Sequence, residues 1–236
     1  MRKKPGRGAD LQVCGGSPDP PGPAWTPVCR LKACPTRTSA PGWTLNASAI
    51  MEKLPDGGRY RLRLTPNKTG QSGSAFLSQP IAFHAGNTFS YYFQFQMTDA
   101  NSQASDGMTF VLQTEGPTAL GGNGGCLGYA GTGPGCPPFT GGIMPSVAVE
   151  FDRFQNSPYD INDNHVAILT GGQLNDTDPQ TPYGVTDCQP TGAFGCMNNG
   201  DVWSVWIDYD GTSLHVAVAD DSDRRPANRA TRTITL

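Results

Sequence analysis

Acidic side chains gather in one stretch of a chain that otherwise carries few charges. The stretch VAVEFDRFQNSPYDINDNHVAI covers residues 147–168, whereas Asp, Glu, Lys and Arg make up only 16% of the 236 residues. Alternation along a strand places Glu150 and Asp152 on one face, with Val149 and Phe151 on the other. Two ionised carboxylates side by side on an apolar strand are costly unless a cation or a proton compensates them. The pair therefore calls for a cation or a proton beside it.

Other ligand types follow this pair within a short distance. Asn156 and Asp160 offer oxygen atoms, which suit calcium, and His165 offers an imidazole nitrogen, which suits a transition metal ion. The alternative is a hydrated polar edge on which Glu150 pairs with Arg153 or another base, and a Glu-x-Asp pair alone favours that alternative. The spacing of the added amide, carboxylate and imidazole groups instead favours a metal site.

Short segments of alternating apolar and polar residues predict the strands that position these groups. In residues 88–97, for example, Phe93 and Phe95 share one face while Gln94 and Gln96 share the other. Segments with this strand pattern are 42–49, 59–65, 74–80, 88–97, 107–113, 146–154, 165–169, 202–209, 213–219 and 231–236. Asp210-Gly211 signals a two-residue hairpin. No helical period persists, so we predict an all-β fold of antiparallel sheets packed as a sandwich or jelly roll.

The composition limits the classes of partner. The net charge is −3, and basic residues cluster only in the first residues, MRKKPGR. Nucleic acids and anionic membranes both attract clustered Lys and Arg. No apolar run reaches the length of about 18 residues that a membrane-spanning helix needs. We therefore expect no nucleic-acid partner and no membrane insertion.

The cysteines indicate the cellular compartment. Among the seven Cys, two close pairs lie in Gly- and Pro-rich segments, Cys126 with Cys136 and Cys188 with Cys196. None has the spacing of a zinc or thioredoxin-type motif, which favours disulfides that staple loops and an extracellular or secreted location. Unpaired cysteines are the alternative. The chain shows no recognisable signal peptide, because no apolar stretch follows its basic start.

Three motifs in order carry a family resemblance. The segment DGMTF at 106–110, the glycine loop GGNGGCLGY at 121–129 and the acidic stretch resemble the legume-type (L-type) lectin family over about 43–236. The resemblance implies a concanavalin-like jelly roll that binds glycans without catalysis, and a homo-oligomer formed through sheet packing is an open possibility. We interpret residues 1–41 as an irregular tail and 42–236 as the lectin-like domain. Since the family continues beyond the strand matching 231–236, we expect the domain to lack its last strand or strands.

The resemblance also implies a two-metal site. Glu150, Asp152, Asp160 and His165 would hold manganese or another transition metal ion. Calcium would take Asp152, Asp160, Asn156 and the carbonyl of Phe154. Asp152 and Asp160 would then bridge the two ions.

A sugar site would lie beside the ions. The resemblance assigns it Asp106, Gly125, Phe154 and Asn156, with a cis peptide bond before Asp106. Asp106 would accept hydrogen bonds from sugar hydroxyls, and Asn156 and the backbone N–H of Gly125 would donate them. Phe154 would stack on the sugar ring. Cys126, directly after Gly125, departs from the usual glycine loop of the family.

Two other functions compete with the lectin interpretation. A laminarinase-type glycoside hydrolase also has a Glu-x-Asp strand in a jelly roll, but it needs a second Glu where this chain has Phe154 or Gln155. A structural or adhesion module stabilised by metal, without a working sugar site, is the other alternative. The glycine loop and Asp106 speak against that module.

Overall fold

The protein is described from a computed structural model. The description covers residues 10–12, 42–55, 60–98, 105–131, 141–174, 182–184, 196–220, 224–226 and 230–234. Within these ranges the chain forms β-strands and one short 3-10 helix, η1 (Gly124–Cys126). All strand pairings between them are antiparallel, so the predicted all-β fold is confirmed. No described helix is long and apolar enough to cross a membrane.

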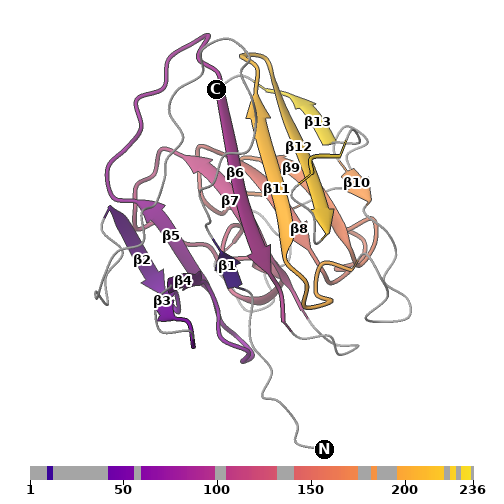
Figure 1. Cartoon of the computed structure of the whole chain (residues 1–236). Helices are drawn as coiled ribbons and strands as arrows, with labels where there is room; N and C mark the ends of the chain where they lie inside the picture. Colours follow the sequence, from indigo (N-terminus) through magenta and orange to yellow (C-terminus); the bar gives the residue numbers. More distant parts are fainter. Residues whose placement is uncertain are drawn as a thin grey trace, which may run out of the picture.

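Two sheets form the body of the molecule (Figure 1). The larger sheet has the order β13-β12-β11-β6-β1-β4-β3, made of β13 (Ala230–Thr233), β12 (Ser213–Asp220), β11 (Trp203–Tyr209), β6 (Phe89–Gln96), β1 (Asp10–Gln12), β4 (Tyr60–Arg63) and β3 (Ile50–Lys53). The smaller sheet has the order β10-β9-β8-β7, made of β10 (Pro182–Gly184), β9 (His165–Thr170), β8 (Ser146–Asp152) and β7 (Gly107–Gln113). A separate pair joins β2 (Trp43–Ala47) to β5 (Gly73–Leu77).

Every segment predicted to be a strand contains one. The strands β1, β3 and β10 were not predicted; each has only three or four residues, and no longer alternating segment surrounds it. Strand β1 lies inside 1–41, so the prediction of an irregular segment is wrong at Asp10–Gln12, where β4 and β6 supply backbone partners on both sides. The other residues of 1–41 lie outside the described ranges.

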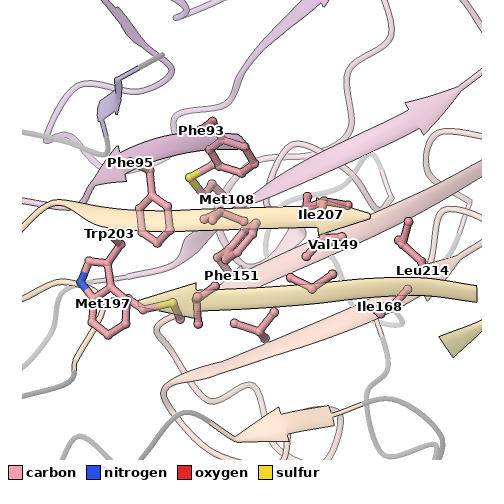
Figure 2. Close-up of a cluster of buried hydrophobic side chains, with 14 of the residues drawn as sticks. Phe93, Phe95, Met108, Val149, Phe151, Ile168, Met197, Trp203, Ile207 and Leu214 are labelled. Carbon is pink, nitrogen blue, oxygen red and sulfur yellow. The ribbon is translucent and has the colours of Figure 1, made fainter. Parts of the chain in front are cut away.

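The main core fills the space between the two sheets (Figure 2). From β8, Val149 and Phe151 point into it and are fully buried, as their alternation predicts. The ring of Phe151 contacts Phe95 of β6 at a centroid distance of 5.3 Å and Phe93 at 6.0 Å. Since aromatic side chains bury large apolar areas, these contacts fix how β8 lies against the opposite sheet.

The opposite face of the smaller sheet is covered by the glycine loop. Tyr129, at the end of this loop, is fully buried, and its hydroxyl lies 2.9 Å from Oγ of Ser146. The same hydroxyl accepts a hydrogen bond from the N–H of Gly172 at 3.0 Å. The loop is thereby tied to β8 and to the turn after β9, over the sheet face that also carries Glu150.

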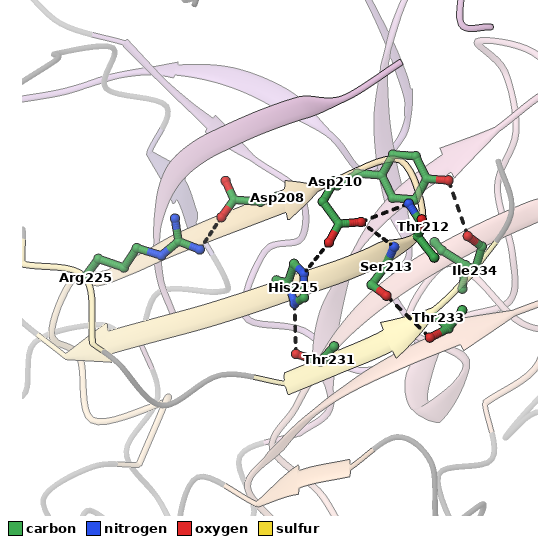
Figure 3. A network of polar contacts seen from close by, with 10 residues as sticks. Asp208, Asp210, Thr212, Ser213, His215, Arg225, Thr231, Thr233 and Ile234 are labelled. Atoms are coloured by element: carbon green, nitrogen blue, oxygen red, sulfur yellow. Dashed lines mark hydrogen bonds and ion pairs between the residues drawn. The ribbon is translucent and has the colours of Figure 1, made fainter. Parts of the chain in front are cut away.

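The hairpin between β11 and β12 carries a polar network (Figure 3). Asp210 donates its N–H to the carbonyl of Ser213, so Gly211 and Thr212 form the tip. The predicted two-residue hairpin is present, but its tip lies one residue later than Asp210-Gly211 suggested. The left-handed φ of +97° at Gly211 explains the shift, because the glycine occupies the first central position.

Candidate functional site

Adjacent strands bring three ligand-type side chains together. The register of β8 and β9 pairs Asp152 with His165, and alternation puts Glu150 on the same face as Asp152. The three residues each offer a ligand atom, and these atoms lie within 4.8 Å of one another. All three are buried, with exposed fractions of 1% for the two acids and 0% for the histidine.

Burial of these acids creates an electrostatic conflict that a cation would relieve. The pKa of Asp152 is raised well above its usual range, first by burial and then by the charge of Glu150, while His165 opposes the shift and Asp160 adds to it. Carboxylate oxygens and an imidazole nitrogen form a donor set that suits a divalent transition metal ion. The residues present therefore fit such an ion.

The histidine is oriented as a ligand. Its Nδ1 lies 3.0 Å from the carbonyl of Asn162, and a carbonyl can only accept, so Nδ1 carries the proton. The other ring nitrogen, Nε2, lies 3.7 Å from Oε2 of Glu150, which exceeds hydrogen-bond length. A carbonyl that fixes the ring and tautomer in this way is the usual outer partner of a metal-binding histidine.

The loop after β8 folds back on the ligand cluster. Phe154 donates its N–H to Oδ1 of Asp152 at 2.6 Å, and the N–H of Asn156 donates to Oδ2 of Asp160. Tyr159 closes the turn by donating its N–H to the carbonyl of Asn156 at 2.8 Å. Asp160 is 9% exposed and lies outside the cluster of three, although its charge acts on Asp152. The turn therefore gathers amide and carboxylate oxygens beside the buried acids.

The other predicted site residues converge on the same place. A Cβ on Gly125 would lie 3.0 Å from Oδ1 and 3.1 Å from Nδ2 of Asn156, and one on Gly124 would lie 3.8 Å from Oδ2 of Asp106. The Ser105–Asp106 peptide bond is cis, as the resemblance implied. Burial raises the pKa of Asp106 above its usual value. The carboxylate of Asp106, the amide of Asn156 and the glycine backbone at 124–125 thus lie close together.

Phe154 stands apart from the core. Its exposed fraction is 41%, so the ring is turned toward solvent rather than packed inside. Phe154 comes two residues before Asn156 in the same loop, and its exposed ring is a flat apolar surface.

The hydrated-edge alternative is wrong, and its residues have other roles. Glu150 and Asp152 are buried, and the guanidinium of Arg153 contacts Asp163 and Asn198 rather than forming an exposed pair with Glu150. The contact with Asn198 could not be predicted from the sequence, because Asn198 is 45 residues away from Arg153.

The cysteine pairs are described only in part. Cys126 and Cys196 are fully buried and disulfide-bonded. Cys136 and Cys188 lie outside the described residues, so the identity of each partner stays a prediction. Burial of Cys126 directly after Gly125 means that this part of the glycine loop packs inward.

Comparison with known proteins adds an independent result. The sequence model of the legume lectin domain matches residues 46–234. The chain is similar to the L-type lectin-domain containing receptor kinases I.8 and I.7 of Arabidopsis thaliana, with 26% identity over 78% of this chain and 30% identity over 74%. It spans only 27% and 25% of the length of these relatives.

Among solved structures, the chain resembles the metal-free form of lectin I-B4 from Griffonia simplicifolia. The TM-score is 0.53 with 16% identity, and the match covers 83% of this chain and 79% of that one. At this identity the likeness shows the fold alone. Because the domain match covers most of the sequence, the chain belongs to the legume lectin family.

Proposed function

We propose that this chain is a lectin domain that binds carbohydrate without catalysis, with calcium and manganese or another transition metal ion holding its site in shape. The observation that carries the proposal is the convergence of Asp106, Gly125 and Asn156 beside a buried cluster of acids and imidazole. Membership of the legume lectin family supports it.

The proposed metal ligands are those that the family resemblance implies, and their donor types suit the two ions. We assign Glu150, Asp152, Asp160 and His165 to the transition metal ion. Asp152, Asp160, Asn156 and the carbonyl of Phe154 form an all-oxygen set for calcium. When bound, the ions neutralise the buried carboxylates and fix the loop that carries Asn156.

The sugar contacts follow from the hydrogen-bonding capacity of each group. Asp106 accepts hydrogen bonds from sugar hydroxyls, while the amide of Asn156 and the backbone N–H of Gly125 donate them. The exposed ring of Phe154 supplies an apolar surface for one face of a pyranose. Glycans and glycoconjugates are therefore the proposed partners.

The burial of the acids argues against hydrolysis. A retaining glycosidase needs two carboxyl groups that reach the scissile bond, but Glu150 and Asp152 are each 1% exposed. Phe154 and Gln155 occupy the positions where the hydrolase family places its second Glu. We therefore favour binding over catalysis.

An extracellular location is part of the proposal. The disulfide-bonded state of Cys126 and Cys196 supports it, since disulfides persist in oxidising compartments. Association into a homo-oligomer through sheet packing stays a prediction.

Two substitutions test the metal and sugar roles separately. Asp152→Ala should abolish binding of both ions and of sugar, because this carboxylate belongs to both ligand sets. Asp106→Ala should remove sugar binding and keep most of the metal. The measurements are calcium and manganese titration calorimetry followed by a glycan array, each with and without EDTA.

The exposed Asp201 gives a control, because Asp201→Ala removes a surface carboxylate that belongs to neither ligand set. An unchanged calcium stoichiometry in Asp152→Ala would reject the metal site. Release of reducing sugar would favour the hydrolase. Chelator-sensitive melting with no glycan signal would favour a structural module.

A further inference from the structure

A buried arginine lies in the middle of the candidate site. Arg153 sits between Asp152 and Phe154 in sequence, yet its exposed fraction is only 4%. A guanidinium stays charged at all physiological pH values and is seldom buried without partners. Its partners therefore show what the residue does.

The side chain and backbone of Arg153 join three separate segments. Its Nε donates to Oδ1 of Asn198 at 2.7 Å, and its Nη1 donates to the carbonyl of Asp163 at 2.8 Å, with Oδ2 of Asp163 3.5 Å away. Its backbone N–H donates to the carbonyl of Asp106 at 2.7 Å. One residue thus connects the start of the loop 153–164 to its far end, to the peptide of Asp106 and to the segment around Asn198.

The segment that receives Nε is itself well anchored. Asn198 is 2% exposed, and the neighbouring Met197 donates its N–H to Oδ1 of Asn164 at 3.1 Å. Asn199 forms an isolated β-bridge with Thr98, two residues after β6, and accepts the indole N–H of Trp203 at 3.4 Å. Asn198 is therefore a fixed point, and Arg153 ties the loop to it.

We propose that Arg153 is a positioning residue that holds the loop 153–164 closed against Asp106 before any ion binds. The inference rests on the proposed function, since the loop carries the ligands assigned to calcium. The guanidinium is a permanent cation whose hydrogen bonds keep both ends of the loop together.

The consequence is a preorganised site. Because the loop is already ordered, calcium binding loses less free energy to loop ordering, and the affinity of the site for calcium is higher. Outer partners of metal ligands typically change metal affinity by about 10–100-fold when they are removed. Loss of Arg153 should therefore weaken calcium binding by that factor and weaken sugar binding at limiting calcium, with recovery at excess calcium.

Amide hydrogen exchange of the full chain tests the loop directly. In EDTA, Arg153→Met should speed amide exchange by at least about tenfold at three N–H groups, those of position 153, Phe154 and Tyr159. The hydrogen bonds of these groups depend on loop closure. Exchange at the core positions Val149 and Ile168 should stay unchanged. A purely structural role would instead raise exchange in the core as well.

Three further variants sharpen the test. Arg153→Lys keeps the charge but loses the forked hydrogen bonds, so it should give an intermediate effect. Asn198→Ala removes the acceptor of the Arg153 Nε hydrogen bond. This variant replaces Arg153→Met in the test if Arg153→Met does not fold. Arg61→Met is the matched control, because Arg61 is 8% exposed and paired with Glu52 in the other sheet.

Unchanged loop exchange in both Arg153→Met and Asn198→Ala would overturn the proposal, as would equal effects in Arg61→Met. The exchange in EDTA does not depend on ligand binding. If the wild-type chain bound neither calcium nor glycan, the proposed function would fall, while the metal-free exchange would still decide the role of Arg153.

Discussion

Asp152 shows how burial and like charge act on a single side chain. Its carboxyl is 1% exposed and lies beside Glu150, and both effects raise its pKa. A group whose pKa is higher in the folded than in the unfolded state stabilises the fold fully below the unfolded value and loses that contribution as pH rises through the folded value. The metal-free fold should therefore lose stability through this group as pH rises above the ordinary value of 3.8 and through the raised pKa of the folded state.

Replacement of Asp152 by Asn tests this sign. In EDTA, the urea midpoint of the wild-type chain should fall more steeply from pH 4 to pH 8 than that of Asp152→Asn. In saturating calcium the ion would take the place of the proton on Asp152 of the wild-type chain. The wild-type urea midpoint should then depend on pH no more steeply than that of Asp152→Asn. Parallel pH profiles in EDTA would contradict the expectation.

The site residues differ in how far the sequence could predict them. Glu150, Asp152 and His165 followed from strand alternation and from the family spacing, and the structure brings them together. Arg153 and Asn198 could not be predicted, since their contact joins residues 45 apart and leaves no local pattern. Tertiary packing alone creates it.

At the scale of elements, the hairpin of β11 and β12 is held by one carboxylate. Oδ1 of Asp210 accepts the N–H groups of Ser213 at 2.8 Å and Thr212 at 2.9 Å, and Oδ2 lies 3.1 Å from Nε2 of His215. These bonds, that of Ser213 first, lower the pKa of Asp210 to about 2. The other ring nitrogen of His215 reaches Thr231 on β13 at 2.9 Å, so the network extends to a third strand.

Asp210 should change the stability of the fold with pH in the opposite direction to Asp152. A lowered pKa in the folded state gives stability that is present above the ordinary value of 3.8 and is lost as pH falls toward about 2. Asp210→Asn should lower the melting temperature at neutral pH and flatten its decline between pH 4 and pH 2. Identical acid profiles for the two proteins would show that the hairpin network contributes nothing to stability.

Strands were predicted correctly where the alternation of apolar and polar residues was long enough to recognise. Strands such as β6 and β8 show alternation over seven or eight residues, and their inward faces form the observed core. The hairpin tip was displaced by one residue, because the sequence signal does not say which turn position the glycine takes. Strand β1 depends on partners on both sides and has no signal of its own.

At the scale of the whole molecule, the smaller sheet has two different faces. One face packs into the core, and the other carries the ligand cluster beneath the glycine loop. Because the ligands project from strands that also build the core, ion binding should be coupled to global folding.

Calcium should therefore raise the melting temperature of the whole chain. A free calcium concentration of about 100 times the dissociation constant stabilises the folded state by about 2.7 kcal/mol, which corresponds to about 5–10 °C for a domain of this size. Differential scanning calorimetry with calcium and with EDTA measures the shift. Asp152→Ala should show none, and an equal shift in that variant would place the stabilising ion elsewhere.

The contact of Arg153 with Asn198 lies close in sequence to a buried tryptophan, whose fluorescence can report on it. The indole of Trp203 is 2% exposed and donates to Asn199, the residue after Asn198, so it senses the anchor rather than the sugar. Ultraviolet emission from this tryptophan should then report displacement of the loop's tether and stay nearly silent when a saccharide docks. With Trp25, Trp43 and Trp206 replaced by Phe, Trp203 becomes the fluorophore for following loop release in real time.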